Sequence, residues 1–386
     1  MNFKKSVLSL AIATALFSSA AWAELDVGAP ESSSTGNSAT VSQVGGADSQ
    51  ALVDQTGNRN SGSISQDNTV NATANILTIG NDNTATVSQQ GNNGTVNVTQ
   101  MESNGSSATA TQTEGYSDNN RIDINQTFTT ASSATVTQDD FDHQATIDQS
   151  NVVNGSVTVS QSDQAQTAAI AQTNGADLSI LVDQDGTNNL TAVNQTGTNN
   201  SISIGQIEDG ANNMVNVNQD GSNSTVAIDQ TATQGSQVVV NQTEAYSDGN
   251  VVSVAQTNTI NSSAEINQDD GFNTANVTQS DGSNLVASVS QSDISNLTNI
   301  NQSGGSDLTA SVTQDGLSND ASLTQIGGSM NSASISQEGD AAFSIATVTQ
   351  EGGLGNMALV AQQGTSNIAT VSQVGGENNS ATVYQR

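Results

Sequence analysis

The sequence predicts an all-β fold, a β-solenoid in which two parallel sheets are stacked as cross-β layers. Three observations lead to this prediction: a short motif recurs at a nearly constant spacing, the motif alternates with the period of a strand, and glycine and asparagine separate its copies. Hydrophobic residues make up 33% and aromatic residues 3% of the 386 residues, which is too little for ordinary compact cores. Such a chain either stays disordered or buries small side chains in many similar layers.

The motif reads Asn/Ser-x-Ala-x-Val/Ile-x-Gln. Anchored on its glutamine, it recurs 30 times between Gln43 and Gln385, with Thr78 as the single substitute for the anchor. Counted along the sequence, 25 of the 29 spacings between successive anchors equal either 11 or 12. The residue two positions before the anchor is Val or Ile in 28 of the 30 copies, with Ala110 and Leu323 as the exceptions. This regularity identifies a structural repeat.

Each copy of the motif predicts one strand of about seven residues followed by a tight turn. The motif positions six, four, two and zero residues before the anchor share one face of a strand, and the opposite face is mostly Ser and Thr. A helix is disfavoured because the β-branched residues have no companions three or four positions away. Gly and Asn after the anchor, as in Thr56-Gly57-Asn58, supply the turn conformations.

One such strand cannot bury its inner face alone, but stacked copies can. Two strands per rung predict about 15 rungs of about 23 residues, stacked over about 70 Å. Ladders of Val, Ile and Ala fill the inside, and stacked amides of Asn and Gln hydrogen-bond to the copies above and below. The same amides could form a binding surface, but a structural role is the simpler interpretation. The predicted ladder residues are Gln43, Gln55, Gln66, Gln89, Gln100, Gln112, Gln138, Gln195, Gln206, Gln362, Gln373, Gln385, Asn60, Asn200 and Asn367.

The chain divides into three segments. Residues 1–23 are typical of a secretory signal peptide, since Lys4 and Lys5 precede an apolar run that ends at a small-x-small cleavage site. Residues 24–36 form a short acidic leader, and residues 37–386 form the repeat array. Removal of residues 1–23 takes two of the five basic residues and none of the 37 acids, so the charge changes from −32 to −34. We therefore expect an exported chain that inserts no segment into a membrane.

The sequence also contains a longer repeat that spans many copies of the motif. The segment from Gln112 to Asn120 returns as Gln242 to Asn250, at an offset of 130 (242 minus 112) that spans eleven motifs. We infer an internal duplication. Because eleven is odd, the duplicated loops are expected at opposite edges of a two-strand rung, which favours a rung with two nearly equivalent halves.

Acidic residues collect at turns and strand ends. Two interpretations stay open: stacked like charges could act as gatekeepers that delay pairing, or they could simply keep the surface solvated. The candidate gatekeepers are Asp139, Asp140, Asp185, Asp269, Asp270 and Asp315. Gatekeeping predicts faster polymerisation as the pH falls toward the carboxylate range.

The sequence gives little support for a metal site, an ice-binding surface, an enzyme or a nucleic-acid-binding protein. The segment from Asp139 to His143 is the only cluster with metal-ligand chemistry, and His143 occupies the position where Asn or Ser usually begins the motif, so we expect no metal and no cofactor there. The repeat lacks the nine-residue period of calcium-binding β-rolls. Its Ser, Thr, Asn and Asp are too mixed for the flat threonine array of an ice-binding solenoid. With no Cys and one His, no catalytic residues are expected, and the strong negative charge disfavours binding to nucleic acid.

The motif resembles the curlin repeat, Gln-x-Gly-x2-Asn-x-Ala-x3-Gln. The stretch from Gln362 to Gln373 reproduces that pattern in full, and the stretches from Gln55 to Gln66 and from Gln195 to Gln206 differ only at the Ala. The resemblance covers residues 37–386, and the chain is identified as a member of the curlin-repeat proteins with an unusually large number of repeats.

The resemblance implies a function. Curlins are secreted by bacteria across the outer membrane through a secretion pore as unfolded chains, and they polymerise with themselves on a surface-bound nucleator subunit into curli, the functional amyloid of the biofilm matrix. It therefore implies a structural subunit at the bacterial cell surface that supports adhesion. The alternative is a monomeric β-solenoid that acts as a surface adhesin or ligand-binding repeat protein.

Overall fold

A computed structural model describes residues 12–16, 22–26, 35–113, 119–208, 210–243, 249–339 and 341–386. All regular structure in these ranges is β-strand. The chain forms two compact units, unit 1 from Met1–Gln184 and unit 2 from Asp185–Arg386. Within the described ranges, no helix has the length and apolar character needed to cross a membrane.

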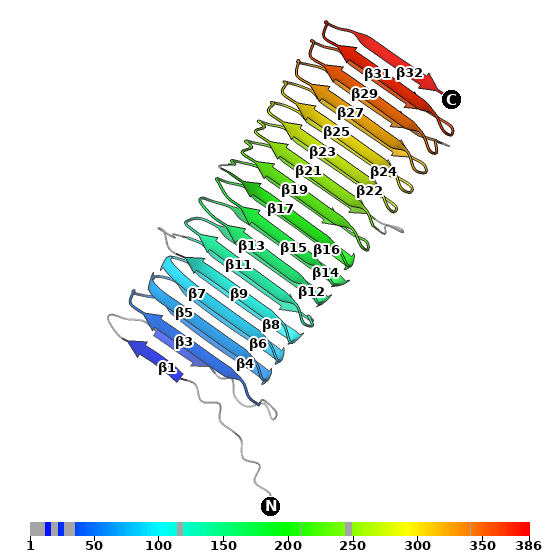
Figure 1. The fold of residues 1–386 in the computed structure, drawn as a ribbon. Coiled ribbons are helices and arrows are strands. Elements are labelled where there is room, and N and C mark those ends of the chain that lie inside the picture. The colour runs from blue at the N-terminus through cyan, green and yellow to red at the C-terminus, as the bar shows by residue number, and fades with distance from the viewer. Residues whose placement is uncertain are drawn as a thin grey trace, which may run out of the picture. The chain divides into compact units, whose positions relative to one another are not determined.

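Unit 1 contains two parallel sheets, one of odd-numbered and one of even-numbered strands (Figure 1). The odd sheet consists of β1 (Ile12–Leu16), β3 (Ser38–Val44), β5 (Ser61–Val70), β7 (Thr84–Asn92), β9 (Ser107–Thr113), β11 (Ser133–Asp139), β13 (Ser156–Gln161) and β15 (Ser179–Gln184). The even sheet consists of β2 (Trp22–Asp26), β4 (Gln50–Asn58), β6 (Thr73–Asn81), β8 (Thr95–Asn104), β10 (Arg121–Thr127), β12 (Gln144–Val153) and β14 (Thr167–Ala176).

Unit 2 repeats this arrangement. Its odd sheet consists of β17 (Ser201–Ile207), β19 (Thr225–Thr231), β21 (Val251–Thr257), β23 (Thr274–Ser280), β25 (Leu297–Ser303), β27 (Asp320–Ile326), β29 (Ile345–Glu351) and β31 (Ile368–Val374). Its even sheet consists of β16 (Leu190–Thr198), β18 (Met214–Gln219), β20 (Gln237–Thr243), β22 (Ser263–Asp269), β24 (Val286–Ser292), β26 (Thr309–Asp315), β28 (Ser332–Gln337), β30 (Met357–Gln362) and β32 (Ser380–Gln385).

Each strand pairs in parallel with the strand two places further along the chain, so that like motif positions stack. In β10 and β12, for example, Ile124 is the register partner of Ile147 and Gln126 that of Gln149. From β3 onward the described residues contain 30 strands, two to a rung, which makes 15 rungs. The predicted fold class, a β-solenoid of two stacked parallel sheets, is confirmed.

The core lies between the two sheets of each unit, and burial alternates along every inner strand as the motif predicts. The burial pattern of β20 alternates between half-buried and buried residues, and Val238 and Val240 are 0% exposed. The two exceptions to the Val/Ile rule, Ala110 and Leu323, are also 0% exposed. Small and β-branched side chains fill a narrow interior because each is stacked on its own copies.

The corners between strands depend on left-handed backbone conformations, which Asn and Asp tolerate better than other residues that carry a side chain. Asn, Asp and Gly account for most of the residues with positive φ. At Gly46, with φ of 77°, a Cβ atom would lie 1.9 Å from the carbonyl oxygen of Thr69 in the next rung, so no other residue fits there.

The structure adds two strands that the sequence did not predict. β1 and β2 lie in the segment assigned to the signal peptide and leader, and they pair in parallel with β3 and β4. The rest of that segment, other than Thr35 and Gly36, lies outside the described residues, as do Tyr116 and Tyr246 in the duplicated loops. β9, which precedes the first of these loops, belongs to an odd sheet, and β20, which precedes the second, belongs to an even sheet.

Candidate assembly surface: amide ladders and strand edges

A column of glutamine side chains runs along the inside of each sheet. Along these columns Nε2 of a Gln donates to Oε1 of the Gln in the next rung, in the same direction in both units, and Gln55 is an exception. In unit 1 the odd sheet carries the bonds from Gln43 to Gln66 (2.6 Å) and from Gln66 to Gln89 (2.8 Å). In unit 2 the even sheet ends with the bond from Gln362 to Gln385 (2.7 Å). The interior members are fully buried, so these bonds satisfy amides that water cannot reach.

The same amides also bind the two sheets together. Gln126 Nε2, on β10, donates to the carbonyl oxygen of Ser107 on β9 at 3.1 Å. Gln302, on β25, donates in the same way to Val286 on β24 at 3.0 Å. Each Gln therefore uses its amide hydrogens along its own sheet and across to the opposite sheet, which neither Asn nor a hydroxyl residue has the length to do.

The structure places the predicted Gln residues as follows. Gln43, Gln66, Gln89, Gln112, Gln138, Gln206 and Gln373 lie in odd sheets, and Gln55, Gln100, Gln195, Gln362 and Gln385 lie in even sheets. Apart from Gln55, all of them donate or accept a ladder bond within their own unit.

Thr78 interrupts the even ladder of unit 1. Its shorter side chain is the register partner of Gln55 and reaches Gln100 only through a 3.4 Å contact between hydroxyl and amide oxygen. Nε2 of Gln55 is therefore left without a ladder acceptor, and its Oε1, which faces the preceding rung, is also buried without a hydrogen-bond partner among the described residues. A buried amide without partners costs about 1–3 kcal/mol, so this place is a weak point of the ladder.

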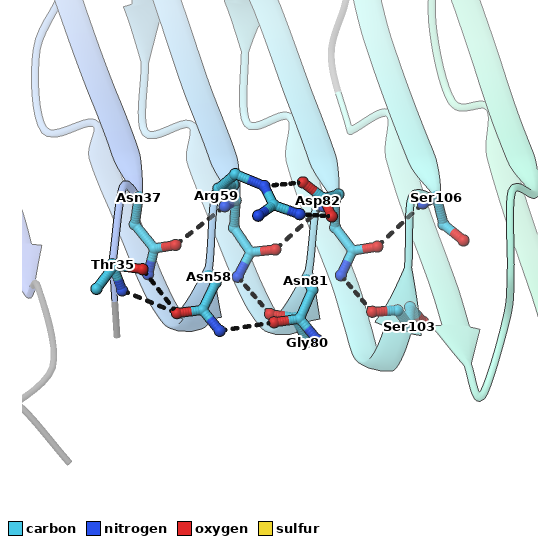
Figure 2. A network of polar contacts seen from close by, with 11 residues as sticks. Thr35, Asn37, Asn58, Arg59, Gly80, Asn81, Asp82, Ser103 and Ser106 are labelled. Carbon is cyan, nitrogen blue, oxygen red and sulfur yellow. Dashed lines mark hydrogen bonds and ion pairs between the residues drawn. The ribbon is translucent and has the colours of Figure 1, made fainter. Parts of the chain in front are cut away.

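A second column stands where the chain turns into each strand. Figure 2 shows it at the first rungs of unit 1: the backbone N–H of Asn60 donates to Oδ1 of Asn37 at 2.9 Å, and that of Asn83 donates to Oδ1 of Asn60 at 3.1 Å. Asn60 Nδ2 in turn donates to the carbonyl oxygen of Gly80, one rung further along, at 2.9 Å. The side chain thus replaces the backbone partners that a corner cannot supply.

The other two predicted Asn residues lie in the same column of unit 2. Asn200 Oδ1 accepts the backbone N–H of Ser224 at 3.0 Å, one rung further along. Asn367, at the C-terminal edge, donates from Nδ2 to the carbonyl oxygen of Gln363 at 2.7 Å.

His143 occupies the corresponding column at the strand starts of the even sheet of unit 1 and is 0% exposed. Its Nδ1 accepts the backbone N–H of Gln166 at 3.2 Å, and its Nε2 lies 2.6 Å from the carbonyl oxygen of Asp139. This pattern requires the neutral tautomer with the proton on Nε2. Burial lowers the pKa of the imidazole, although the nearby carboxylates Asp140 and Asp142 oppose the shift.

Short polar ladders also line the outer corners. Asn58 donates to Asn81 at 3.0 Å, and Arg59 forms an ion pair with Asp82 one rung away (Figure 2). Arg59 lowers the pKa of Asp82 mainly through their hydrogen bond. Both side chains are well exposed, so solvent screens the pair and its contribution to stability is small.

The candidate gatekeepers lie at strand ends and in corners, with none of them buried. Asp139, Asp269 and Asp315 end their strands, Asp140 and Asp270 follow with positive φ, and Asp185 follows β15. In unit 2, slight burial of the exposed Asp293, together with repulsion from Asp315 and Asp270, raises the pKa of its carboxyl group. Over the described parts of the chain, no group of three or more His, Asp or Glu side chains could hold a metal ion.

The last strands have an unpaired edge. Among the described residues, β31 pairs with β29 only and β32 pairs with β30 only. Val383 in β32 is half-buried, whereas Val360 at the same position of β30 is 0% exposed. The inner columns are therefore open at this edge.

Sequence reasoning missed one feature of the outer faces because it pooled the two sheets. In the odd sheet of unit 1, the outward positions five, three and one residues before the anchor are all Ser or Thr from β3 to β13. They are residues 38, 40, 42, 61, 63, 65, 84, 86, 88, 107, 109, 111, 133, 135, 137, 156, 158 and 160. The even sheet carries Arg121, Asp123 and Asp148 at such positions, and separating alternate motifs in the sequence would have revealed the difference.

The family model described as curlin associated repeat matches residues 175–207 and 305–339. These two stretches thus carry the curlin repeat that the sequence motif resembles. The starts of the two matches are offset by 130 (305 minus 175), the same value as in the inferred duplication, which supports that inference. No curated protein matches the chain.

Proposed function

We propose that this chain is a secreted structural subunit that polymerises into curli-like functional amyloid fibres. One observation carries the proposal: the inner Gln, Val/Ile and Asn columns run to the edge formed by β31 and β32 and stay open there. An edge of unpaired parallel strands with self-complementary ladders is a template for another chain of the same kind.

The curlin repeat supports the biological setting of this proposal. It favours a location at the bacterial cell surface in the biofilm matrix and a role in adhesion, with a nucleator subunit and an outer-membrane secretion pore as partners. A non-enzymatic role follows from the same reading, since the repeat and the solenoid serve structure in this family.

Electron microscopy of the mature chain, incubated without a nucleator, tests the proposal. We expect unbranched fibres with a meridional reflection at about 4.8 Å. Discrete particles that never elongate would overturn the proposal and would favour the monomeric adhesin instead.

The acidic corners are proposed to act as gatekeepers that slow this polymerisation. Asp293 supports the idea, because slight burial and the nearby carboxylates of Asp315 and Asp270 raise its pKa. Stacking a second copy brings more carboxylates together, and lowering the pH removes that repulsion. We expect thioflavin fluorescence to rise several-fold faster at pH 4–5 than at pH 7.5. An equal or slower rise at the lower pH would contradict the gatekeeper role and leave only a solubilising one.

A further inference from the structure

The first and last complete rungs share an identical eight-residue segment. Residues 39–46 and 369–376 both read Ala-Thr-Val-Ser-Gln-Val-Gly-Gly, and the spacing to the next anchor is the same, from Gln43 to Gln55 and from Gln373 to Gln385. The first copy lies in β3 and its corner, and the second lies in β31 and its corner. The edge strand of unit 2 is therefore a near replica of the first repeat strand of unit 1.

The two corners also share their backbone conformation. The φ angles are 69° at Gly45 and 62° at Gly375, and 77° at both Gly46 and Gly376. Asp48 and Asn378, two residues further on, have φ angles of 55° and 53°. The next odd corner of unit 1 instead begins with Asp67, Asn68 and Thr69, whereas Gly-Gly corners follow β25, β27, β29 and β31 in unit 2.

Gly-Gly corners stack closely on one another. A Cβ atom at Gly353 would lie 2.6 Å from the carbonyl oxygen of Gly376 in the next rung, and a Cβ atom at Gly328 would lie 2.5 Å from that of Gly353. The column of Gly-Gly corners in unit 2 ends at Gly376, and the corner after β3 has the same conformation.

The polar groups of the two edges are complementary. At the C-terminal edge, Nε2 of Gln385 and Gln373 keep their bonds to the opposite sheet, to Ile368 (2.8 Å) and Met357 (3.0 Å), but there is no further rung in unit 2 to accept a ladder bond. At the start of unit 1, Oε1 of Gln55 is buried without a donor. Ladder bonds run from Nε2 toward the following rung throughout, so the direction fits as well.

We propose that the edge formed by β31 and β32 binds the edge formed by β3 and β4 of a second copy in one register, with Gln373 on Gln43 and Gln385 on Gln55. The inference rests on the proposed self-assembly and adds its polarity and its contacts. A bond from Gln385 Nε2 supplies the missing donor for Gln55 Oε1. The Oδ1 atoms of Asn367 and Asn379 accept the backbone N–H groups at the strand starts of the second copy.

The first rung of unit 1 already binds parallel strands at this edge. β1 and β2 pair with β3 and β4, with Ala15 as the register partner of Gln43 and Asp26 as that of Asp54. Cleavage of the predicted signal peptide removes all of β1 and the start of β2. Secretion would thus free β3 for a second copy, which would displace the remaining residues 24–26 from β4.

Cross-linking of single-cysteine variants tests the register, since the chain contains no cysteine of its own. Ser42→Cys and Ser372→Cys place one thiol each on the outer faces of β3 and β31, at positions that the proposed register sets about 4.8 Å apart, within disulfide range. The two variants of the mature chain are mixed, assembled and oxidised, and the fibres are analysed by non-reducing electrophoresis and mass spectrometry. Matched controls pair Ser42→Cys with Thr382→Cys, which lies in the opposite sheet, and assemble each variant alone.

We expect the disulfide between positions 42 and 372 to exceed every control product by about tenfold or more. Fibres in which 42–42, 372–372 or 42–382 products equal it would overturn the register while leaving the proposed function intact. An absence of fibres from the unsubstituted chain would overturn both. If the serine variants alone fail to assemble, Thr40→Cys and Thr370→Cys test the same register two residues away on the same strands.

A second measurement isolates the Gln55 contact. Gln55→Thr removes the acceptor with a residue that the ladder already accommodates at Thr78. We expect it to slow elongation of preformed fibres about fivefold, the value of one hydrogen bond. Gln126→Thr, deep in the even ladder of unit 1, is the control and should leave elongation within about twofold of the unsubstituted chain. An unchanged elongation rate in Gln55→Thr would contradict the proposed contact.

Discussion

Units 1 and 2 keep the glutamine column almost intact, but their even sheets fill the column at the start of each strand differently. In unit 1 this column is Ser49, Ala72, Gly94, Asn120, His143 and Gln166. In unit 2 it is Asn189, Asn213, Ser236, Ser262, Leu285, Leu308, Asn331, Asn356 and Asn379. The glutamine must donate both along its sheet and across to the other, whereas the residue at the strand start has only to accept one N–H or to be apolar. The first demand admits one residue type, and the second admits many.

The largest expected effects come from substitutions of equivalent core residues in the two units. Val136 in β11 and Ile266 in β22 are counterparts at the offset of 130, and both are 0% exposed. We expect Ile266→Ala to destabilise its rungs by about 2–4 kcal/mol, and Val136→Ala to cost about 1–3 kcal/mol because it removes fewer methyl groups. Hydrogen exchange of the adjacent strands measures the loss, since openings in a solenoid are local. A larger loss at Val136 would show that the units are not packed alike.

Substitutions in the glutamine ladder are expected to have the next largest effect on stability. Thr78→Gln in unit 1 restores an acceptor for Nε2 of Gln55, and we expect the amides of β4 and β6 to gain about 1–2 kcal/mol of protection. Gln242→Thr makes the opposite change within the continuous ladder of unit 2 and should cost a similar amount. Hydrogen exchange at pH 7 compares the two. No gain from Thr78→Gln would mean that Gln55 is satisfied by water in solution.

Most of the fold could be predicted from the sequence, because the alternation of Val41 and Gln43, repeated 30 times, fixes the strand, its inner face and its stacking partner. The position of His143 in the strand-start column also follows from its place in the motif. The unpaired amide of Gln55 could not be predicted, since it depends on the length of Thr78 in the adjoining rung. The identical segments of β3 and β31 are visible in the sequence. Only the structure shows that β31 is an edge strand and that β3 is the first strand of the repeat array.

The smallest expected effect is the pH dependence of stability at two equivalent positions, His143 in unit 1 and Asn273 in unit 2. Both are 0% exposed and make equivalent bonds: each backbone N–H donates to an Asn Oδ1, and each side chain accepts a backbone N–H, from Gln166 at 3.2 Å and from Asn296 at 2.9 Å. Only the imidazole titrates. Protonation of Nδ1 would place two N–H groups against each other and break the bond to Gln166.

Burial lowers the pKa of His143 in the folded chain, so the unfolded chain binds more protons as the pH falls below about 6.5. The stability that neutral His143 contributes is therefore complete above that pH and is lost as the pH falls through the folded pKa. At pH 6 we expect the rungs around β12 to lose less than about 1 kcal/mol relative to pH 7.5, and the rungs around β23 to show no such loss. His143→Asn should make β12 behave like β23. Hydrogen exchange corrected for its intrinsic pH dependence measures the difference, and a pH-dependent loss that persists in His143→Asn would exclude His143 as its source.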